Sequence, residues 1–134
     1  MPPGVTPVYQ ACRSAGLSAR AHTATLAPGQ ERLTIVLTST SPIGCRLEGF
    51  PAVRVLSDRK TVTATIAIER GEPQPLRLEP GVSAAFTLTY TVRKARAPAL
   101  WGLAVIPPGD VRPLYVPAAI DAGERMLESP LRRI

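Results

Sequence analysis

The chain has 134 residues, the length of one domain, with a net charge of +6 and 15 prolines. No apolar run is long enough to span a membrane as a helix, and prolines this frequent argue against a helical bundle. The basic residues are almost all arginine and asparagine is absent. GC-rich codon usage would produce that bias as readily as selection for an anionic partner, so the charge alone indicates little about function.

The first ten residues, MPPGVTPVYQ, predict a flexible, proline-rich lead-in, and residues 11–134 predict one domain. Threonine, valine and other β-forming residues then alternate with apolar residues, which is typical of half-buried strands. The turn signals recur every ~8–12 residues, as in a sandwich. The sequence therefore predicts an all-β, antiparallel β-sandwich of eight or nine strands. They are expected at Leu17–Leu26, Glu31–Thr40, Phe50–Leu56, Thr61–Glu69, Leu76–Leu78, Ser83–Val92, Leu100–Ile106, Leu114–Val116 and Met126–Glu128.

The apolar members of these alternations predict the core, although a shift of one residue would turn each set outward. Trp101, the single tryptophan, is expected to pack there too, because burying an aromatic side chain is favourable. Between two strands, Glu79-Pro80-Gly81-Val82 predicts a type II turn. The predicted core is Leu33, Ile35, Leu37, Val53, Val55, Ile66, Ile68, Leu78, Phe86, Leu88, Leu103 and Val105.

Several motifs appear in a specific order. Cys12 is followed by C-R-L-E-G-F-P from Cys45 to Pro51, by L-R-L-E-P-G-V-S-A from Leu76 to Ala84, and by V-I-P-P from Val105 to Pro108. In this order the chain resembles the domain of unknown function 4232 family, over nearly its whole length. The pair formed by the first two motifs is the most specific part of the resemblance.

The resemblance implies an immunoglobulin-like β-sandwich with a disulfide between Cys12 and Cys45, and it implies no known activity. Relatives are extracytoplasmic domains of actinobacteria, which predicts a secreted or membrane-anchored protein whose signal or anchor is absent from this chain. Relatives often carry a second cysteine pair, near Trp101 and near Asp121 to Gly123. This chain lacks those cysteines, so its last 30 residues are expected to be looser.

The residues themselves leave three interpretations of the cysteines: a structural disulfide, two free thiols, or a redox or metal site. The last lacks support because there is no C-x-x-C spacing, and zinc needs about four ligands. The chain offers only two cysteines and His22, which is expected on the polar face of a strand. Cys45 is expected in a loop, and a bridge to Cys12 would close the end of the sandwich. There Leu47 and Phe50 would cover the core.

No catalytic site is expected. The chain has neither G-x-S-x-G nor H-E-x-x-H, and its loop aspartates, Asp58, Asp110 and Asp121, are more typical of turns. No cofactor is expected, and nucleic-acid binding would need more aromatic stacking platforms. An enzyme or redox protein would require a pocket that gathers these aspartates or His22.

Basic residues cluster at three places: Arg59 and Lys60, Arg93, Lys94 and Arg96, and Arg132 and Arg133 at the tail. The first two clusters are the candidate anion-binding residues. Charge runs are usually solvated, so they also fit a merely soluble surface. We therefore expect a non-enzymatic binding module of the cell envelope, whose partner would be a protein, a glycan or an anionic headgroup. An architectural domain of an envelope assembly is the alternative.

Overall fold

The computed structural model describes residues 10–57, 61–62, 65–68, 74–92, 100–120 and 122–134. Within these ranges the chain is all-β, apart from one short 3-10 helix, η1 (Ser14–Gly16). The strands are β1 (Leu17–Ala27), β2 (Gln30–Ser39), β3 (Cys45–Leu47), β4 (Ala52–Ser57), β5 (Thr61–Val62), β6 (Thr65–Ile68), β7 (Leu76–Leu78), β8 (Ser83–Val92), β9 (Leu100–Ile106), β10 (Leu114–Ile120), β11 (Ala122–Glu128) and β12 (Arg132–Arg133). The described residues include no helix that could cross a membrane.

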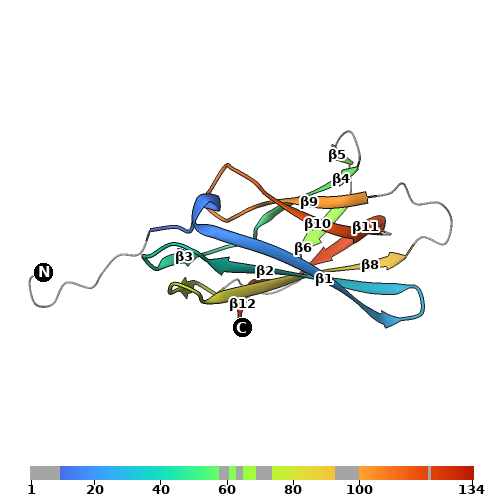
Figure 1. Ribbon diagram of the computed structural model, residues 1–134. Coiled ribbons are helices and arrows are strands. Elements are labelled where there is room, and N and C mark those ends of the chain that lie inside the picture. Colours follow the sequence, from blue (N-terminus) through green and yellow to red (C-terminus); the bar gives the residue numbers. More distant parts are fainter. Residues whose placement is uncertain (1–9, 58–60, 63–64, 69–73, 93–99, 121) are drawn as a thin grey trace, which may run out of the picture.

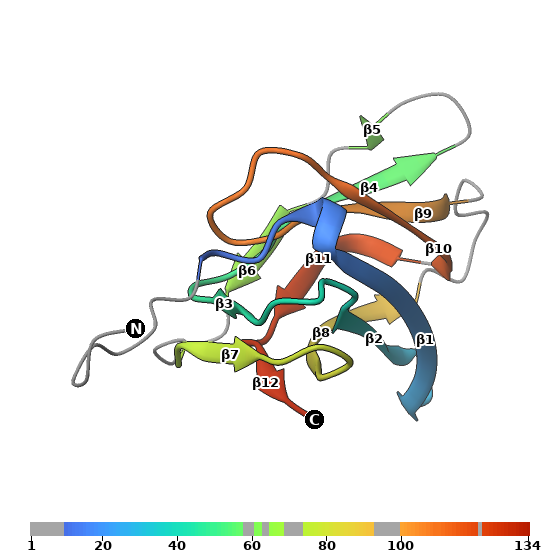
Figure 2. The same cartoon turned by 60° about the vertical axis from the view of Figure 1, so that its left-hand side comes forward.

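Two main sheets form the molecule (Figure 1). One has the strand order β1-β2-β8-β11-β6, with β12 pairing beside β11 along β8, and the other has the order β10-β9-β4-β5. A small ladder of β3 and β7 lies at the end of the molecule from which the N-terminal segment leaves (Figures 1 and 2). Side chains of all three sheets join one hydrophobic cluster, so the predicted all-β sandwich is confirmed.

The core follows the predicted alternation. In β2 and β8, Leu33 lies opposite Leu88 and Ile35 opposite Phe86, and all four side chains are buried. Val53 is partly buried against this cluster. The side chains of Ile66, Ile68 and Trp101 lie outside the described part. The remaining predicted members are also buried: Leu37, Val55, Leu78, Leu103 and Val105.

Three differences from the predicted elements have simple physical causes. The alternating stretch expected as one strand, Thr61–Glu69, is two strands: β5 pairs with β4 in one sheet, and β6 pairs with β11 in the other. Because alternation signals only which face is buried, it cannot show that a strand changes sheet. The pairing of β6 with β11 is parallel, whereas every other strand ladder described is antiparallel. Cys45 lies in strand β3 and not in a loop.

The predicted turn before β8 has the hydrogen bond and backbone of a type II turn. The Val82 N–H donates to the Glu79 carbonyl at 2.9 Å, and Gly81 has φ +81. Beside this turn, β12 pairs with Ala84 and Ala85 at the start of β8. Leu131 is buried in the core cluster just before it. The expected looseness of the last 30 residues stays a prediction.

Candidate functional site

The disulfide implied by the resemblance is present. Cys12 and Cys45 are bonded, with an S–S distance of 2.00 Å and a Cα–Cα distance of 4.8 Å. Both residues are buried, at 1% and 8% exposure. A disulfide indicates an oxidising environment. It ties the segment before β1 to β3, and we call this end of the sandwich, formed by residues 10–16, 40–45 and 107–113, the stapled end.

Backbone hydrogen bonds, in addition to the disulfide, fix the N-terminal segment to β3. The Cys12 N–H donates to the Arg46 carbonyl at 2.8 Å, and the Arg46 N–H donates to the Gln10 carbonyl at 2.9 Å. Ala11 thereby forms an isolated parallel bridge with Arg46. The segment is therefore an additional strand-like partner of β3, and Gln10 is fixed although it belongs to the predicted lead-in.

Asp110 attaches the loop between β9 and β10 to the same segment. Its carboxylate accepts hydrogen bonds from the N–H groups of Ser14 at 2.8 Å, Val111 at 2.7 Å and Arg112 at 3.3 Å. These bonds, that from Ser14 foremost, lower the pKa of Asp110 to about 2, against an opposing effect of desolvation. The side chain is 4% exposed, and the Arg13 guanidinium lies 3.8 Å from it. The carboxylate is thus engaged in binding backbone, which leaves it poorly suited to proton transfer.

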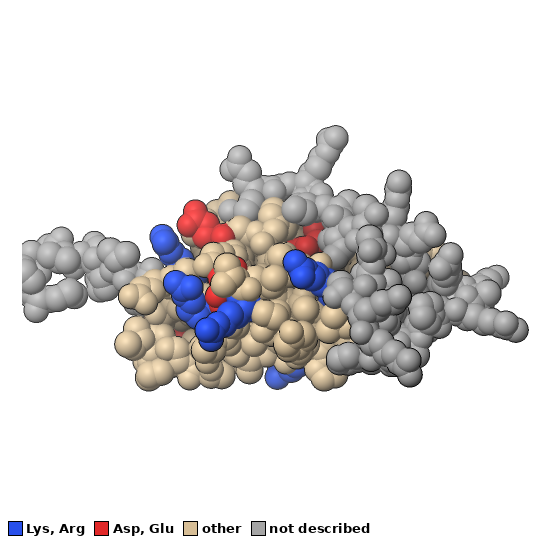
Figure 3. Space-filling model, turned by 90° about the horizontal axis from the view of Figure 1, so that it is seen from above, with Lys and Arg blue, Asp and Glu red and all other residues tan. Residues whose placement is uncertain are grey.

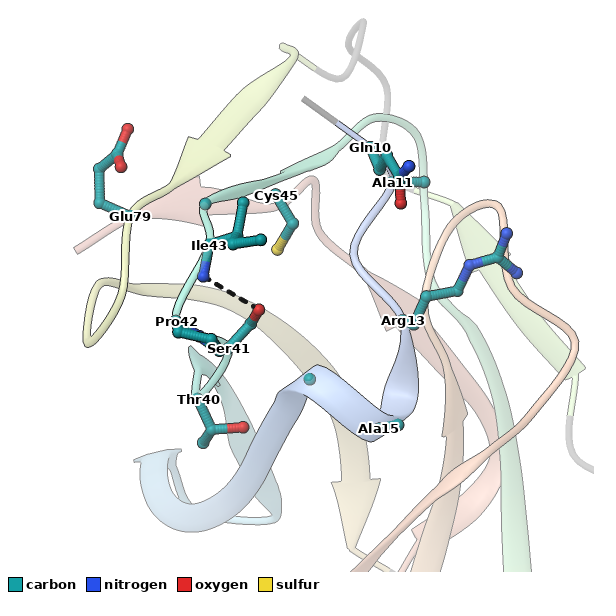
Figure 4. A pocket seen from close by; sticks show the side chains of 12 residues that line it. Gln10, Ala11, Arg13, Ala15, Thr40, Ser41, Pro42, Ile43, Cys45 and Glu79 are labelled. Atoms are coloured by element: carbon teal, nitrogen blue, oxygen red, sulfur yellow. Dashed lines mark hydrogen bonds between the residues drawn. The ribbon is translucent and has the colours of Figure 1, made fainter. Parts of the chain in front are cut away.

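An open groove of about 760 Å³ lies at the stapled end, between the N-terminal segment and the loop that joins β2 to β3 (Figure 4). Its volume is within the range of ligand pockets. The Ser41 hydroxyl accepts a hydrogen bond from the Ile43 N–H at 3.2 Å, which bends this loop. The lining residues are mostly small or apolar: Gln10, Ala11, Arg13, Ala15, Gly16, Thr40, Ser41, Pro42, Ile43, Gly44, Cys45 and Glu79.

The groove combines an exposed aliphatic side chain with two charges of opposite sign. Ile43 is 73% exposed, whereas Arg13 and Glu79 have side-chain exposures of 68% and 48%. Figure 4 places Arg13 and Glu79 on opposite sides of the groove. Figure 3 shows basic side chains near the end from which the N-terminal segment leaves, with acidic side chains among them. The Glu79 carboxylate already pairs with Arg77 at 3.3 Å. The groove can therefore contact an apolar group through Ile43 and an anionic group through Arg13 together.

Of the polar residues singled out from the sequence, His22, Asp110, Arg132 and Arg133 are described by the structure, and none of them lines this groove. His22 is exposed in the middle of β1, opposite Thr34. In the described part of the chain no cluster of three or more potential ligands could hold a metal ion. The remaining candidates lie outside the described residues: Asp58, Arg59, Lys60, Arg93, Lys94, Arg96 and Asp121.

Glu128 is the polar residue that the sequence did not single out. It lies in β11 directly opposite Leu88, on the face that meets the core, and it is 3% exposed. Its Oε2 atom receives no hydrogen bond from the described residues. Burial raises the pKa of Glu128 to about 7. The sequence held one sign that Glu128 is buried, because Met126 and Glu128 share one face of the expected strand. That strand was too short to show which of its faces points to the core.

The groove was not predicted either, since it depends on how three loops meet.

Comparison with known proteins gives one match. No curated protein and no solved structure matches the chain. The family model described as "Domain of unknown function (DUF4232)" matches residues 12–130, a span from the first cysteine of the staple to the residue before Leu131. The chain therefore belongs to the DUF4232 family.

Proposed function

We propose that the chain is a non-enzymatic binding domain of the bacterial cell envelope, which holds an extended segment of a protein partner in the groove at its stapled end. The observation that carries this proposal is the exposure of Ile43 inside a groove. A side chain that is 73% exposed on a loop costs free energy to leave in water. Aliphatic anchors in grooves are a common basis of peptide recognition.

The chemistry of the groove suggests what the segment carries. Pro42, Ile43 and the alanines of the groove suit an aliphatic side chain, and Arg13 suits an acidic residue beside it. Among the described residues, Arg13 forms an ion pair with Asp110 at 3.8 Å, which is weak at such exposure. A partner carboxylate can therefore compete for this guanidinium. The net charge of +6 also favours encounter with an acidic partner.

The envelope location rests on the disulfide, which persists in oxidising compartments. The non-enzymatic part of the proposal rests on the use of Asp110. The described part of the stapled end holds one strongly perturbed carboxylate, and its oxygens already accept three backbone N–H groups. Rigid positioning by the disulfide and by Asp110 is what a preorganised binding surface requires.

A matched pair of variants tests the proposal. Ile43→Ser removes the anchor, and Ile134→Ser makes the same change at a side chain of nearly equal exposure, 72%, that does not line the groove. Immobilised wild type and both variants are incubated with cell-envelope extract, and the retained proteins are identified. We expect one partner that binds wild type and Ile134→Ser, loses at least about tenfold in affinity for Ile43→Ser, and weakens with salt. Equal retention by Ile43→Ser, or no retained partner, would refute the proposal.

A further inference from the structure

Two arginines lie directly opposite each other in the small ladder of β3 and β7, which Figure 2 shows at the end of the molecule from which the N-terminal segment leaves. The register pairs Arg46 with Arg77, and both residues are exposed. Leu47 and Leu78, the residues that follow them, are buried in the core cluster. Because side chains alternate along a strand, both arginines lie on the outer face of the ladder. Two positive charges therefore share one small surface.

The backbone hydrogen bonds of Arg46 show how close the two arginines are. Its N–H donates to the Gln10 carbonyl, and its carbonyl accepts from the Cys12 N–H. Both backbone groups of Arg46 thus point away from β7, so Arg46 and Arg77 form a non-hydrogen-bonded pair. In such pairs the Cα atoms are about 4.5 Å apart and the side chains are closer than in hydrogen-bonded pairs. Like charges placed directly opposite each other destabilise a sheet.

Arg133 brings a third guanidinium to the same place. Its Nη2 atom donates to the Arg77 carbonyl at 2.8 Å, because the backbone groups of a non-hydrogen-bonded residue point away from its partner strand, here β3. Arg133 belongs to β12, which lies beside β7 in Figure 2. Three strands distant in sequence therefore bring together Arg46, Arg77 and Arg133, which we call the arginine cluster.

The described acidic side chains balance this charge in part. The Oε1 atom of Glu79 lies 3.3 Å from Nε of Arg77, in an ion pair whose two side chains are about half exposed and which is weak for that reason. Within the described residues, Arg46, Arg133 and the exposed Glu48 form no ion pair. The positive charges of Arg46 and Arg133 are therefore not balanced by their described surroundings.

We propose that the arginine cluster is a binding site for a phosphate group. A guanidinium presents a planar fork of N–H donors that fits pairs of phosphate oxygens. One fork satisfies the two oxygens of a carboxylate, whereas a phosphate group has further oxygens and suits guanidinium groups that approach from neighbouring strands. Its negative charge would also relieve the repulsion between Arg46 and Arg77. None of the three arginines lines the groove, so the site is independent of the proposed function.

An NMR titration of the isotopically labelled full chain with sodium phosphate tests the site, with chloride added to keep the ionic strength constant. We expect saturable shifts of the backbone N–H signals of β3 and β7. Arg46→Gln and Arg133→Gln should each raise the dissociation constant for phosphate at least about tenfold. The matched control is Arg54→Gln, which changes an exposed arginine of β4 in the other sheet and should bind like wild type. Ile43→Ser should also bind like wild type, which separates this site from the groove.

Two further probes define the ligand. Acetate, a carboxylate, should bind at least about tenfold more weakly than phosphate at the same ionic strength. Vesicles of phosphatidylglycerol and of phosphatidylcholine distinguish the source of the phosphate group. Retention on the anionic vesicles that is lost in Arg46→Gln would identify a lipid headgroup, whereas binding of inorganic phosphate without vesicle binding would identify a free phosphate.

Three results would overturn the proposal. They are the absence of saturable binding to both phosphate and the anionic vesicles, equal affinity for acetate and phosphate, and affinities that stay unchanged in both Arg46→Gln and Arg133→Gln. Thermal unfolding in phosphate-free buffer shows that the variants are folded. In that buffer Arg46→Gln should melt no lower than wild type, because it removes a like-charge pair, whereas phosphate should raise the melting temperature of wild type more than that of this variant.

Discussion

Glu128 has a carboxyl group whose ionisation the fold opposes. It is buried on the core face opposite Leu88, and its pKa is raised from 4.5 to about 7. In the unfolded chain the carboxyl ionises first as the pH rises, so the unfolded state binds fewer protons than the folded state over this range. The free energy of unfolding should consequently fall between about pH 4.5 and about pH 7 and stay level above it.

Glu128→Met tests this, because methionine has a similar volume and does not titrate. Since one pKa unit corresponds to about 1.4 kcal/mol, the variant should gain about 2 to 3 kcal/mol over wild type on going from about pH 4 to about pH 8. Urea unfolding across this range measures the difference, and Leu127→Met, on the exposed face of the same strand, is the control. A difference between wild type and Glu128→Met that does not change with pH would contradict the buried, uncharged acid.

Gly102 is required by the close approach of two backbones. A Cβ atom at this position would lie 2.8 Å from the Val116 carbonyl oxygen, and that oxygen belongs to β10 in the ladder with β9. We expect Gly102→Ala to lower the free energy of unfolding by about 1 to 3 kcal/mol, because the two strands must move apart. Gly16→Ala is the comparison, since its Cβ would meet its nearest atom at 3.4 Å. Equal losses in the two variants would show that the strands adjust freely.

Among the elements, Asp110 joins the loop between β9 and β10 to the segment that precedes β1. Its pKa is lowered to about 2 from 3.8, first by the Ser14 N–H. The ionised carboxylate therefore stabilises the fold at pH values above the unfolded pKa, and this contribution is lost as the pH falls from about 4 through about 2. The loop and the staple should loosen together in strong acid.

Asp110→Asn is expected to lower the melting temperature at neutral pH. The carboxylate accepts the Ser14 N–H at Oδ2 and the Val111 and Arg112 N–H groups at Oδ1, whereas an amide has only one acceptor oxygen and cannot serve both sides. The difference in melting temperature between wild type and variant should become smaller as the pH approaches about 2, where the wild-type carboxyl becomes protonated. Calorimetric scans at several pH values measure it. A gap of constant size at all pH values would mean that Asp110 acts through its shape and not its charge.

The elements that the sequence predicts well are the ones with a strong period of two. β2 and β8 carry unbroken alternations, such as Leu33, Ile35 and Leu37, and both the strands and their inward faces are confirmed. β3 is missed because its three residues are too few to show a period. The break between β5 and β6 is missed for another reason: local alternation does not encode a change of sheet.

The candidate site could not be predicted in the same way. The resemblance implied the disulfide, which the residues alone left as one of three interpretations. The groove depends instead on where the loop 40–44 lies against the N-terminal segment. That placement is set by hydrogen bonds between residues far apart in the chain, such as Ser14 with Asp110. No local pattern contains this information.

For the whole molecule, the disulfide is the covalent contact, beside the hydrogen bonds to Arg46 and Asp110, that joins the N-terminal segment to the body. It spans 33 positions in sequence, and the chain-entropy model gives a closed loop of this size roughly 3–4 kcal/mol of stabilisation through the unfolded state. It also forms part of the groove through Cys45. Its removal should therefore affect stability and the proposed binding surface together.

The double variant Cys12→Ala, Cys45→Ala tests this at the scale of the molecule. Denaturant unfolding should show a loss of roughly 3–4 kcal/mol with the β-sheet spectrum retained, because the strand ladders of the two sheets are held by backbone hydrogen bonds that do not require the disulfide. Thiol labelling of unfolded wild type, before and after reduction, is the control: labels should enter only after reduction. If protein isolated from its native compartment took up two labels without reduction, the oxidising location would lose its support. An unchanged free energy of unfolding in the double variant would show that hydrogen bonds such as Cys12 to Arg46 hold the segment without the staple.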